Sequence, residues 1–105
     1  MVVQPEGGLI HIVWLDRRLD PLGIDYDVFY ATSSDNGRRF KSNIRVTTAS
    51  SNPRGTSFIG DYIDIDGESG PFKIHAVWTD RRSVATSAGS VANDVFTAER
   101  LMPPP

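Results

Sequence analysis

Two arginine-rich triplets are the residues of this chain best suited to chemistry, and each ends the same eight-residue phrase. HIVWLDRR at positions 11–18 returns as HAVWTDRR at positions 75–82. A planar guanidinium can hold a carboxylate through two parallel hydrogen bonds, so the triplets could bind an acidic group on a sugar. They could equally pair with neighbouring carboxylates and loop carbonyls and so fix the loops that carry them. Both uses stay open for Asp16, Arg17, Arg18, Asp80, Arg81 and Arg82.

The elements that must position these triplets are β-strands, and they are repeated as well. DVFYA at positions 27–31 returns as DVFTA at positions 94–98. β-Branched and aromatic residues dominate these stretches, and apolar residues at helical spacing are missing, which indicates an all-β chain. In KIHAVWTD both alternating sets of residues are largely apolar, so this strand should be covered on both sides. We therefore expect Trp14 and Trp78 to lie between packed units.

Short turns join the predicted strands into an antiparallel meander that begins again halfway along the chain. A four-stranded meander that repeats is the blade of a β-propeller. We predict a single domain of two blades, the first over 1–53 and the second over 54–105, with the second lacking its outer strand. The predicted strands cover 1–3, 9–16, 26–33, 43–49, 58–66, 72–80 and 94–100.

One turn carries a resemblance to a known family. SSDNGRRF at positions 33–40 resembles the S-x-D-x-G-x-x-F/W Asp-box, or BNR repeat, of sialidase-like β-propellers. The aspartate can accept backbone N–H bonds across a tight turn, the glycine can take a positive φ, and the phenylalanine can plug the end of the hairpin. FIGDY at positions 58–62 is also similar to bacterial sialidase-like sequences. The Asp-box residues, predicted to be structural, are Ser33, Asp35, Gly37 and Phe40.

The resemblance implies a propeller of six blades, which three chains of two blades would complete. A pair of blades alone leaves strand edges and apolar faces uncovered, and closed cyclic symmetry is the usual way in which identical chains cover such faces. We therefore expect a homo-oligomer, most simply a trimer. The family suggests a secreted or extracellular location, and no signal peptide is predicted in this chain.

Direction along the meander separates the Asp-box from the predicted ligand face. If the first strand of a blade starts at one face, the second strand ends there, and the turn before the fourth strand lies at the opposite face. The two arginine triplets therefore share one face with Asp61 and Tyr62, which lie at the start of the second blade and complete the predicted ligand-binding set.

Two functions fit this arrangement. The resembled sialidases use an arginine triad, an aspartate acid/base and a tyrosine nucleophile, roles for which Asp61 and Tyr62 are candidates and Asp16, Asp80 and Tyr26 are alternatives. The family's Phe-Arg-Ile-Pro motif is absent, and no glutamate is placed to activate a tyrosine. We expect a self-assembling, carbohydrate-interacting propeller module without robust catalysis. The alternative is a sialidase-like glycoside hydrolase, or a fragment of one, acting on acidic sugars.

Composition argues against several other classes. The formal net charge is −2 and the 11 Lys and Arg are spread along the chain, so no nucleic-acid partner is predicted. Apolar runs are too short for a membrane span. Cysteine is absent, and His11 and His75 lie among apolar strand residues with no second ligand at metal spacing. We therefore predict packing roles for the histidines, and no metal or cofactor.

Overall fold

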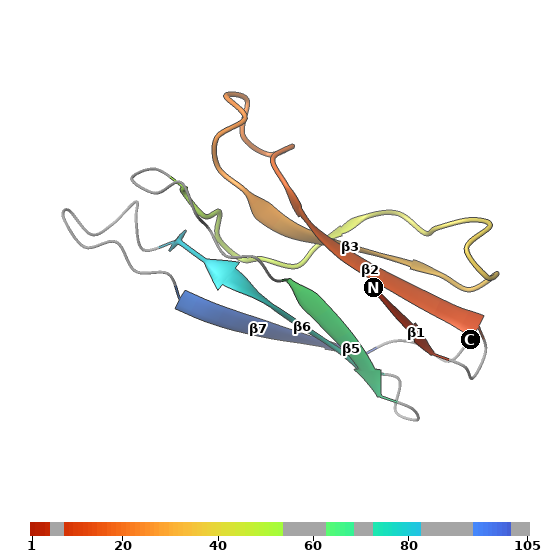
Figure 1. Ribbon diagram of the computed structural model, residues 1–105. Coiled ribbons are helices and arrows are strands. Elements are labelled where there is room, and N and C mark those ends of the chain that lie inside the picture. The colour runs from red at the N-terminus through yellow and green to blue at the C-terminus, as the bar shows by residue number, and fades with distance from the viewer. Residues whose placement is uncertain (5–7, 54–62, 69–72, 83–93, 102–105) are drawn as a thin grey trace.

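Seven strands form two antiparallel sheets in the part of the chain that the computed structural model describes, residues 1–4, 8–53, 63–68, 73–82 and 94–101. Figure 1 shows the two sheets lying one over the other. The first sheet has the order β1 (Val2–Gln4), β2 (Leu9–Asp16), β3 (Asp27–Ser33) and β4 (Ile44–Arg45). The second has the order β5 (Asp64–Glu68), β6 (Lys73–Asp80) and β7 (Asp94–Leu101).

The all-β, antiparallel prediction is confirmed, and the repeated phrases occupy the same register in both sheets. In the first sheet Trp14 lies opposite Phe29 on the neighbouring strand. In the second sheet Trp78 lies opposite Phe96. The repeat in the sequence is therefore a repeat of one two-stranded unit in space.

The fourth strand is shorter than the predicted 43–49, because side chains replace backbone groups in the ladder beyond Arg45. The N–H of Val46 still donates to the Val28 carbonyl at 2.8 Å. The N–H of Val28, however, donates to the side-chain hydroxyl of Thr47, at 3.3 Å, and not to a backbone carbonyl of this segment. Of the predicted strand 58–66, positions 58–62 lie outside the described residues, and β5 starts at Asp64.

The two sheets pack through unlike faces. The first sheet presents the side of β2 and β3 that carries Val13, Val28 and Tyr30, all buried. The second sheet presents the side of β5 and β6 that carries four buried residues, Ile65, Ile74, Ala76 and Trp78. Trp78 therefore lies between the sheets as predicted. The same prediction is wrong for Trp14, which is half-buried on the side of the first sheet that faces away from the second.

Both arginine triplets lie at one end of the sheets. The loop 17–26 leaves β2 at this end, and the phenol of Tyr26 donates to the backbone carbonyl of Thr79, at the end of β6, at 2.9 Å. The Asp-box turn lies at the other end of the first sheet, as Figure 1 shows. The direction of the meander thus separates the two motifs as the sequence predicted.

Candidate functional site

The first triplet is held by a bonded set that we call the first brace, formed by Trp14, Asp16 and Arg18. The Trp14 indole N–H donates to Asp16 Oδ2 at 2.8 Å. The Arg18 backbone N–H donates to Asp16 Oδ1 at 2.7 Å, and its guanidinium donates to Oδ2 at 2.8 Å. One carboxylate thus ties the strand to the loop that follows it.

The second triplet repeats this arrangement in the second brace, formed by Trp78, Asp80 and Arg82. The Trp78 indole donates to Asp80 Oδ2 at 3.0 Å. The Arg82 backbone N–H and Nε both donate to Oδ1 at 2.9 Å, and a third bond joins the guanidinium to Oδ2 at 3.0 Å. The tryptophan, the aspartate and the second arginine of the two octapeptides are therefore members of one structural motif.

Each brace also places its arginine over the aromatic ring of the repeated DVF phrase. The guanidinium carbon of Arg18 lies 4.2 Å from the centre of the Phe29 ring. The equivalent distance from Arg82 to Phe96 is 4.1 Å. Cation–π attraction adds to the carboxylate bonds at this distance. The aspartate, the second arginine and the phenylalanine are thus required together, which explains why both phrases keep them.

The hydrogen bonds of the braces keep their carboxylates ionised. Bonds from the Arg18 side chain and the Trp14 indole hold the pKa of Asp16 well below its usual range. For Asp80, which is fully buried, desolvation is the largest effect and acts to raise the pKa. The side-chain and backbone bonds from Arg82, with that from Trp78, outweigh desolvation, so the pKa of Asp80 is also lowered.

The first arginine of each triplet has a different environment in the two sheets. Arg81 is fully buried; its N–H donates to Ser51 Oγ at 2.8 Å and its Nε to the Asn52 carbonyl at 2.9 Å. Arg17 is exposed, and no hydrogen bond or ion pair joins its guanidinium to the described residues. Arg17 is therefore the triplet arginine that can reach a ligand from this end of the sheets.

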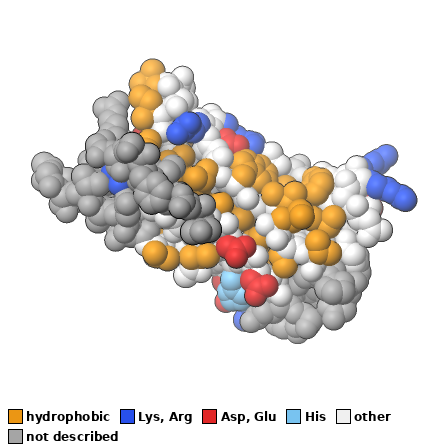
Figure 2. All heavy atoms as spheres, in the orientation of Figure 1, with side chains coloured by type: hydrophobic (Ala, Val, Ile, Leu, Met, Phe, Trp, Pro, Cys, Tyr) orange, Lys and Arg blue, Asp and Glu red, His pale blue; other side chains and the backbone are white. Residues whose placement is uncertain are grey.

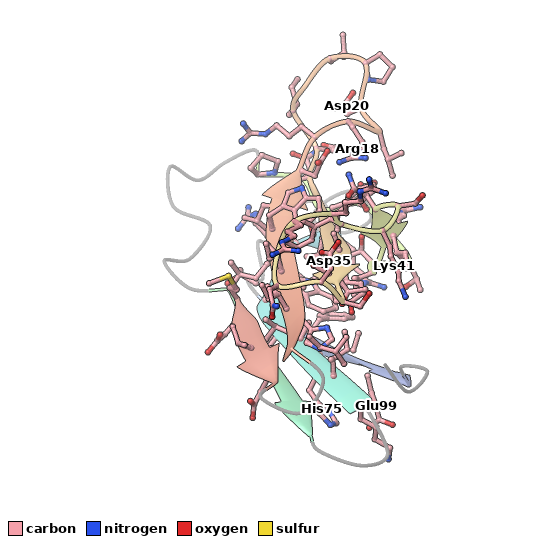
Figure 3. The ribbon with its side chains drawn as sticks, turned by 90° about the vertical axis from the view of Figure 1, so that its right-hand side faces the viewer. Arg18, Asp20, Asp35, Lys41, His75 and Glu99 are labelled. Carbon is pink, nitrogen blue, oxygen red and sulfur yellow. The ribbon has the colours of Figure 1, made fainter. Side chains whose placement is uncertain are left out.

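The loop that carries Arg17 is held in shape by Asp20. Its carboxylate accepts the backbone N–H groups of Leu22, Ile24 and Asp25 at 2.9, 3.0 and 2.8 Å. Figure 3 shows Arg18 and Asp20 together in this loop. A loop ordered by its own backbone bonds presents an exposed cation in a defined place.

Sequence reasoning missed a polar cluster that lies next to the braces. Asp27 is 2% exposed and accepts hydrogen bonds from Arg45 at 2.8 Å, from Thr47 at 2.7 Å and from Ser50 at 2.8 Å. The Arg82 guanidinium reaches the same segment and donates to Thr48 Oγ1 at 3.0 Å. The aspartate that opens both DVF phrases was the signal that could have indicated this cluster.

Ser51 and Tyr26 join the two sheets at the same end. Their backbones exchange two hydrogen bonds of 2.9 Å, while the Ser51 side chain accepts from Arg81. Burial raises the pKa of Tyr26, with a smaller opposing effect from its bond to Ser51. Tyr26 therefore stays a neutral hydrogen-bond donor to the second sheet, which is a structural role. Asp61 and Tyr62, the other predicted ligand residues, lie outside the described residues.

The turn that resembles an Asp-box has the backbone bond expected of its aspartate, and its serine makes further bonds that the sequence pattern did not predict. Asp35 Oδ1 accepts the Arg39 N–H at 2.9 Å, and this bond is the main reason that the pKa of Asp35 is lowered. Ser33 Oγ accepts the Gly37 N–H at 2.9 Å, and Gly37 has a φ of 86°. Phe40 differs from the expectation, because it is 43% exposed and does not fill the end of the hairpin in this chain.

The two histidines lie in different surroundings. His11 is fully buried, with Nδ1 2.7 Å from the Tyr30 hydroxyl, and burial lowers its pKa. His75 lies on the outer side of the second sheet, with Nδ1 3.7 Å from a Glu99 carboxylate oxygen. Among the described residues no three acidic or histidine side chains are grouped as metal ligands would be. The described segments also contain no helix with the length and apolar character of a membrane span.

Comparison of the chain with family models, with curated proteins and with solved structures gave no match.

Proposed function

We propose that this chain is a two-blade module of a sialidase-like β-propeller that interacts with acidic carbohydrate at the end of the blades where the braces lie. The observation that carries the proposal is the duplicated brace: two meander sheets in the same register, each with its arginine triplet at the same end. The Asp-box bonds at the opposite end support the same family. Six blades would then be completed by three chains.

Arg17 supplies the charge for ligand binding in this proposal. Arg18 and Arg82 are already bonded to aspartates, and Arg81 is buried against backbone. Arg17 is exposed on a loop that Asp20 orders. The exposed guanidinium of Arg17 can bind the carboxylate of a sugar bidentately.

The carboxylates of the braces support a binding role over catalysis. A glycosidase acid must hold a proton near neutral pH, which requires a raised pKa. The pKa values of Asp16 and Asp80 are lowered, and both carboxylates are occupied by tryptophan and arginine donors. The module is therefore proposed to bind without robust turnover.

A glycan array with sialylated structures and their desialylated counterparts tests the proposal. The expected result is retention on the sialylated structures, weakened by salt, with no hydrolysis of a fluorogenic sialoside. Arg17→Ala should reduce this retention at least several-fold, whereas Lys41→Ala, which removes an exposed charge near the opposite end, should not. Equal retention on both sets of glycans, or retention unchanged by Arg17→Ala, would contradict the proposal.

A further inference from the structure

The two sheets contact each other through non-equivalent sides: the side that the first sheet buries is not the counterpart of the side that the second sheet buries. In the first sheet the side with Val13 and Tyr30 is covered. In the second sheet the side with Trp78 is covered, and Phe96 and Ala98 pack against it. Since the two sheets are built from the same repeated phrases, the chain contains one example of a head-to-tail contact between successive units.

This contact leaves one side of each sheet uncovered by the other. The Trp14 face of the first sheet consists of Ile10, Ile12, Trp14, Phe29 and Ala31. Ile10, Ile12 and Trp14 are only half-buried there. The Val95 face of the second sheet consists of Val77, Thr79, Val95 and Thr97, with the charged group Lys73, His75 and Glu99 at its far end. Figure 2 shows apolar side chains exposed along the first sheet, and Figure 3 shows His75 beside Glu99 on the second.

The two apolar residues of the Val95 face are strongly exposed. Val95 is 80% exposed and Val77 is 40% exposed. Both are β-branched residues within the paired strands β6 and β7, where a packed neighbour is the usual environment. Their equivalents in the first sheet, Val28 and Val13, are 0% and 8% exposed. The same positions are thus buried in one sheet and open in the other.

The two uncovered faces correspond to the two sides of the contact that already exists. The Trp14 face is built from the positions that, in the second sheet, form the covered Trp78 side. The Val95 face is built from the positions that, in the first sheet, form the covered Val13 side. A surface equivalent to each side of the internal contact is therefore present on every copy of the chain. The Trp14 face is half-buried at Ile10, Ile12 and Trp14 and buried at Phe29 and Ala31, and the Val95 face is exposed at Val77 and Val95.

We propose that a second copy of this chain places its Trp14 face on the Val95 face of the first, repeating the contact between the two sheets. This proposal rests on the blade arrangement given above as the proposed function, but not on sugar binding. The contact is heterologous, because different faces of the two copies meet, so it continues from copy to copy until a ring closes. Thr97 stands where the first sheet has Tyr30, so the new contact carries less aromatic area than the internal one.

Sedimentation velocity of the full chain at micromolar concentration tests the contact. The wild-type chain should sediment as an oligomer, and Val95→Asp should sediment as a monomer, because a carboxylate would be buried in the apolar contact. Val95 is too exposed for the substitution to disturb folding, which circular dichroism will confirm. Leu22→Asp is the matched control: Leu22 is 76% exposed in the loop 17–26, outside both faces, and the variant should assemble like wild type.

A mixture of the two chains distinguishes the head-to-tail contact from a symmetric pair of Val95 faces. Val95→Asp keeps an intact Trp14 face, so an excess of it should bind wild-type chains, block further growth and shift them to smaller species. A wild-type chain that is monomeric at micromolar concentration would overturn the proposal. The proposal would also be overturned if the Val95→Asp variant still formed the oligomer, or if an excess of that variant did not change the size of the wild-type oligomer. Sugar binding by a monomer would overturn this inference alone, whereas assembly without sugar binding would overturn only the binding proposal.

Discussion

Trp14 and Trp78 occupy equivalent positions in the two sheets, yet Trp78 is 4% exposed between them while Trp14 is only half-buried on an outer face. Both indoles donate to the aspartate two residues later, at 2.8 and 3.0 Å. The brace thus forms whether or not a second sheet covers the tryptophan. It is a local device of one strand and its loop, and the sheet contact is added to it.

Removing the buried carboxylate of the second brace should strongly destabilise the fold. Asp80 is fully buried and accepts bonds from Trp78 and Arg82. Asp80→Ala would leave these donors unpaired, and the loss of one partner of a buried pair typically costs about 3 kcal/mol. Urea denaturation measures the loss. Asp66→Ala, which changes an exposed residue of β5, should stay within about 0.5 kcal/mol of wild type.

Acid should destabilise the protein through the two braces. The pKa values of Asp16 and Asp80 are lower in the folded chain than in the unfolded chain. Their stabilising contribution is therefore complete above the unfolded value of about 4 and is lost as the pH falls below it. The urea midpoint of unfolding should therefore fall as the pH is lowered below about 4. In the Asp16→Asn variant the midpoint should fall less steeply with pH. If the midpoint of Asp16→Asn depended on pH as steeply as that of the wild type, the first brace would not govern stability in acid.

His11 should produce a second, separate dependence on pH. Burial lowers its pKa below 6.5, so the unfolded chain binds a proton more readily than the folded chain. Stability should accordingly decrease as the pH falls below about 6.5. NMR titration should give His11 a pKa below 6.5. A His11 resonance that titrates at or above 6.5 would contradict the assignment.

The Asp-box turn should require glycine at position 37 for two reasons. Gly37 has a φ of 86°, and a Cβ there would lie 3.3 Å from the Ile10 Cδ1 atom. Gly37→Ala should therefore destabilise by about 2 kcal/mol. Gly23→Ala is the matched comparison, because Gly23 also has a positive φ but a Cβ would meet nothing within 4 Å. The melting temperature should fall less for Gly23→Ala than for Gly37→Ala. Equal falls would show that the contact with Ile10 does not contribute.

The sequence was sufficient to predict the four longest strands, but neither the length of β4 nor the partners of the polar residues. Alternation and repetition placed β2, β3, β6 and β7, because these depend on residues close together in the chain. The different surroundings of Arg17 and Arg81 could not be predicted. Arg81 is buried because Ser51 and Asn52 of the preceding segment pack against it, and this contact depends on the arrangement of the two sheets.

Phe40 shows a second limit of pattern reasoning. The Asp-box spacing correctly indicated the backbone bond of Asp35 and the positive φ of Gly37, since both belong to the turn itself. The position of Phe40 depends on what covers the hairpin from outside, and it is 43% exposed in this chain. A motif therefore predicted its local hydrogen bonds better than the packing around it.

We propose that the second arginine of the first triplet, Arg18, stabilises the fold and that the first, Arg17, binds ligand. Arg17 and Arg18 are adjacent, so the two alanine variants make a matched pair. The most direct measurement is the urea midpoint together with retention on a sialylated glycan surface for Arg17→Ala and Arg18→Ala. Arg18→Ala should lower the midpoint while the folded protein keeps its retention, and Arg17→Ala should keep the midpoint and lose retention. A lower midpoint for Arg17→Ala, or lost retention at an unchanged midpoint for Arg18→Ala, would contradict this division of roles.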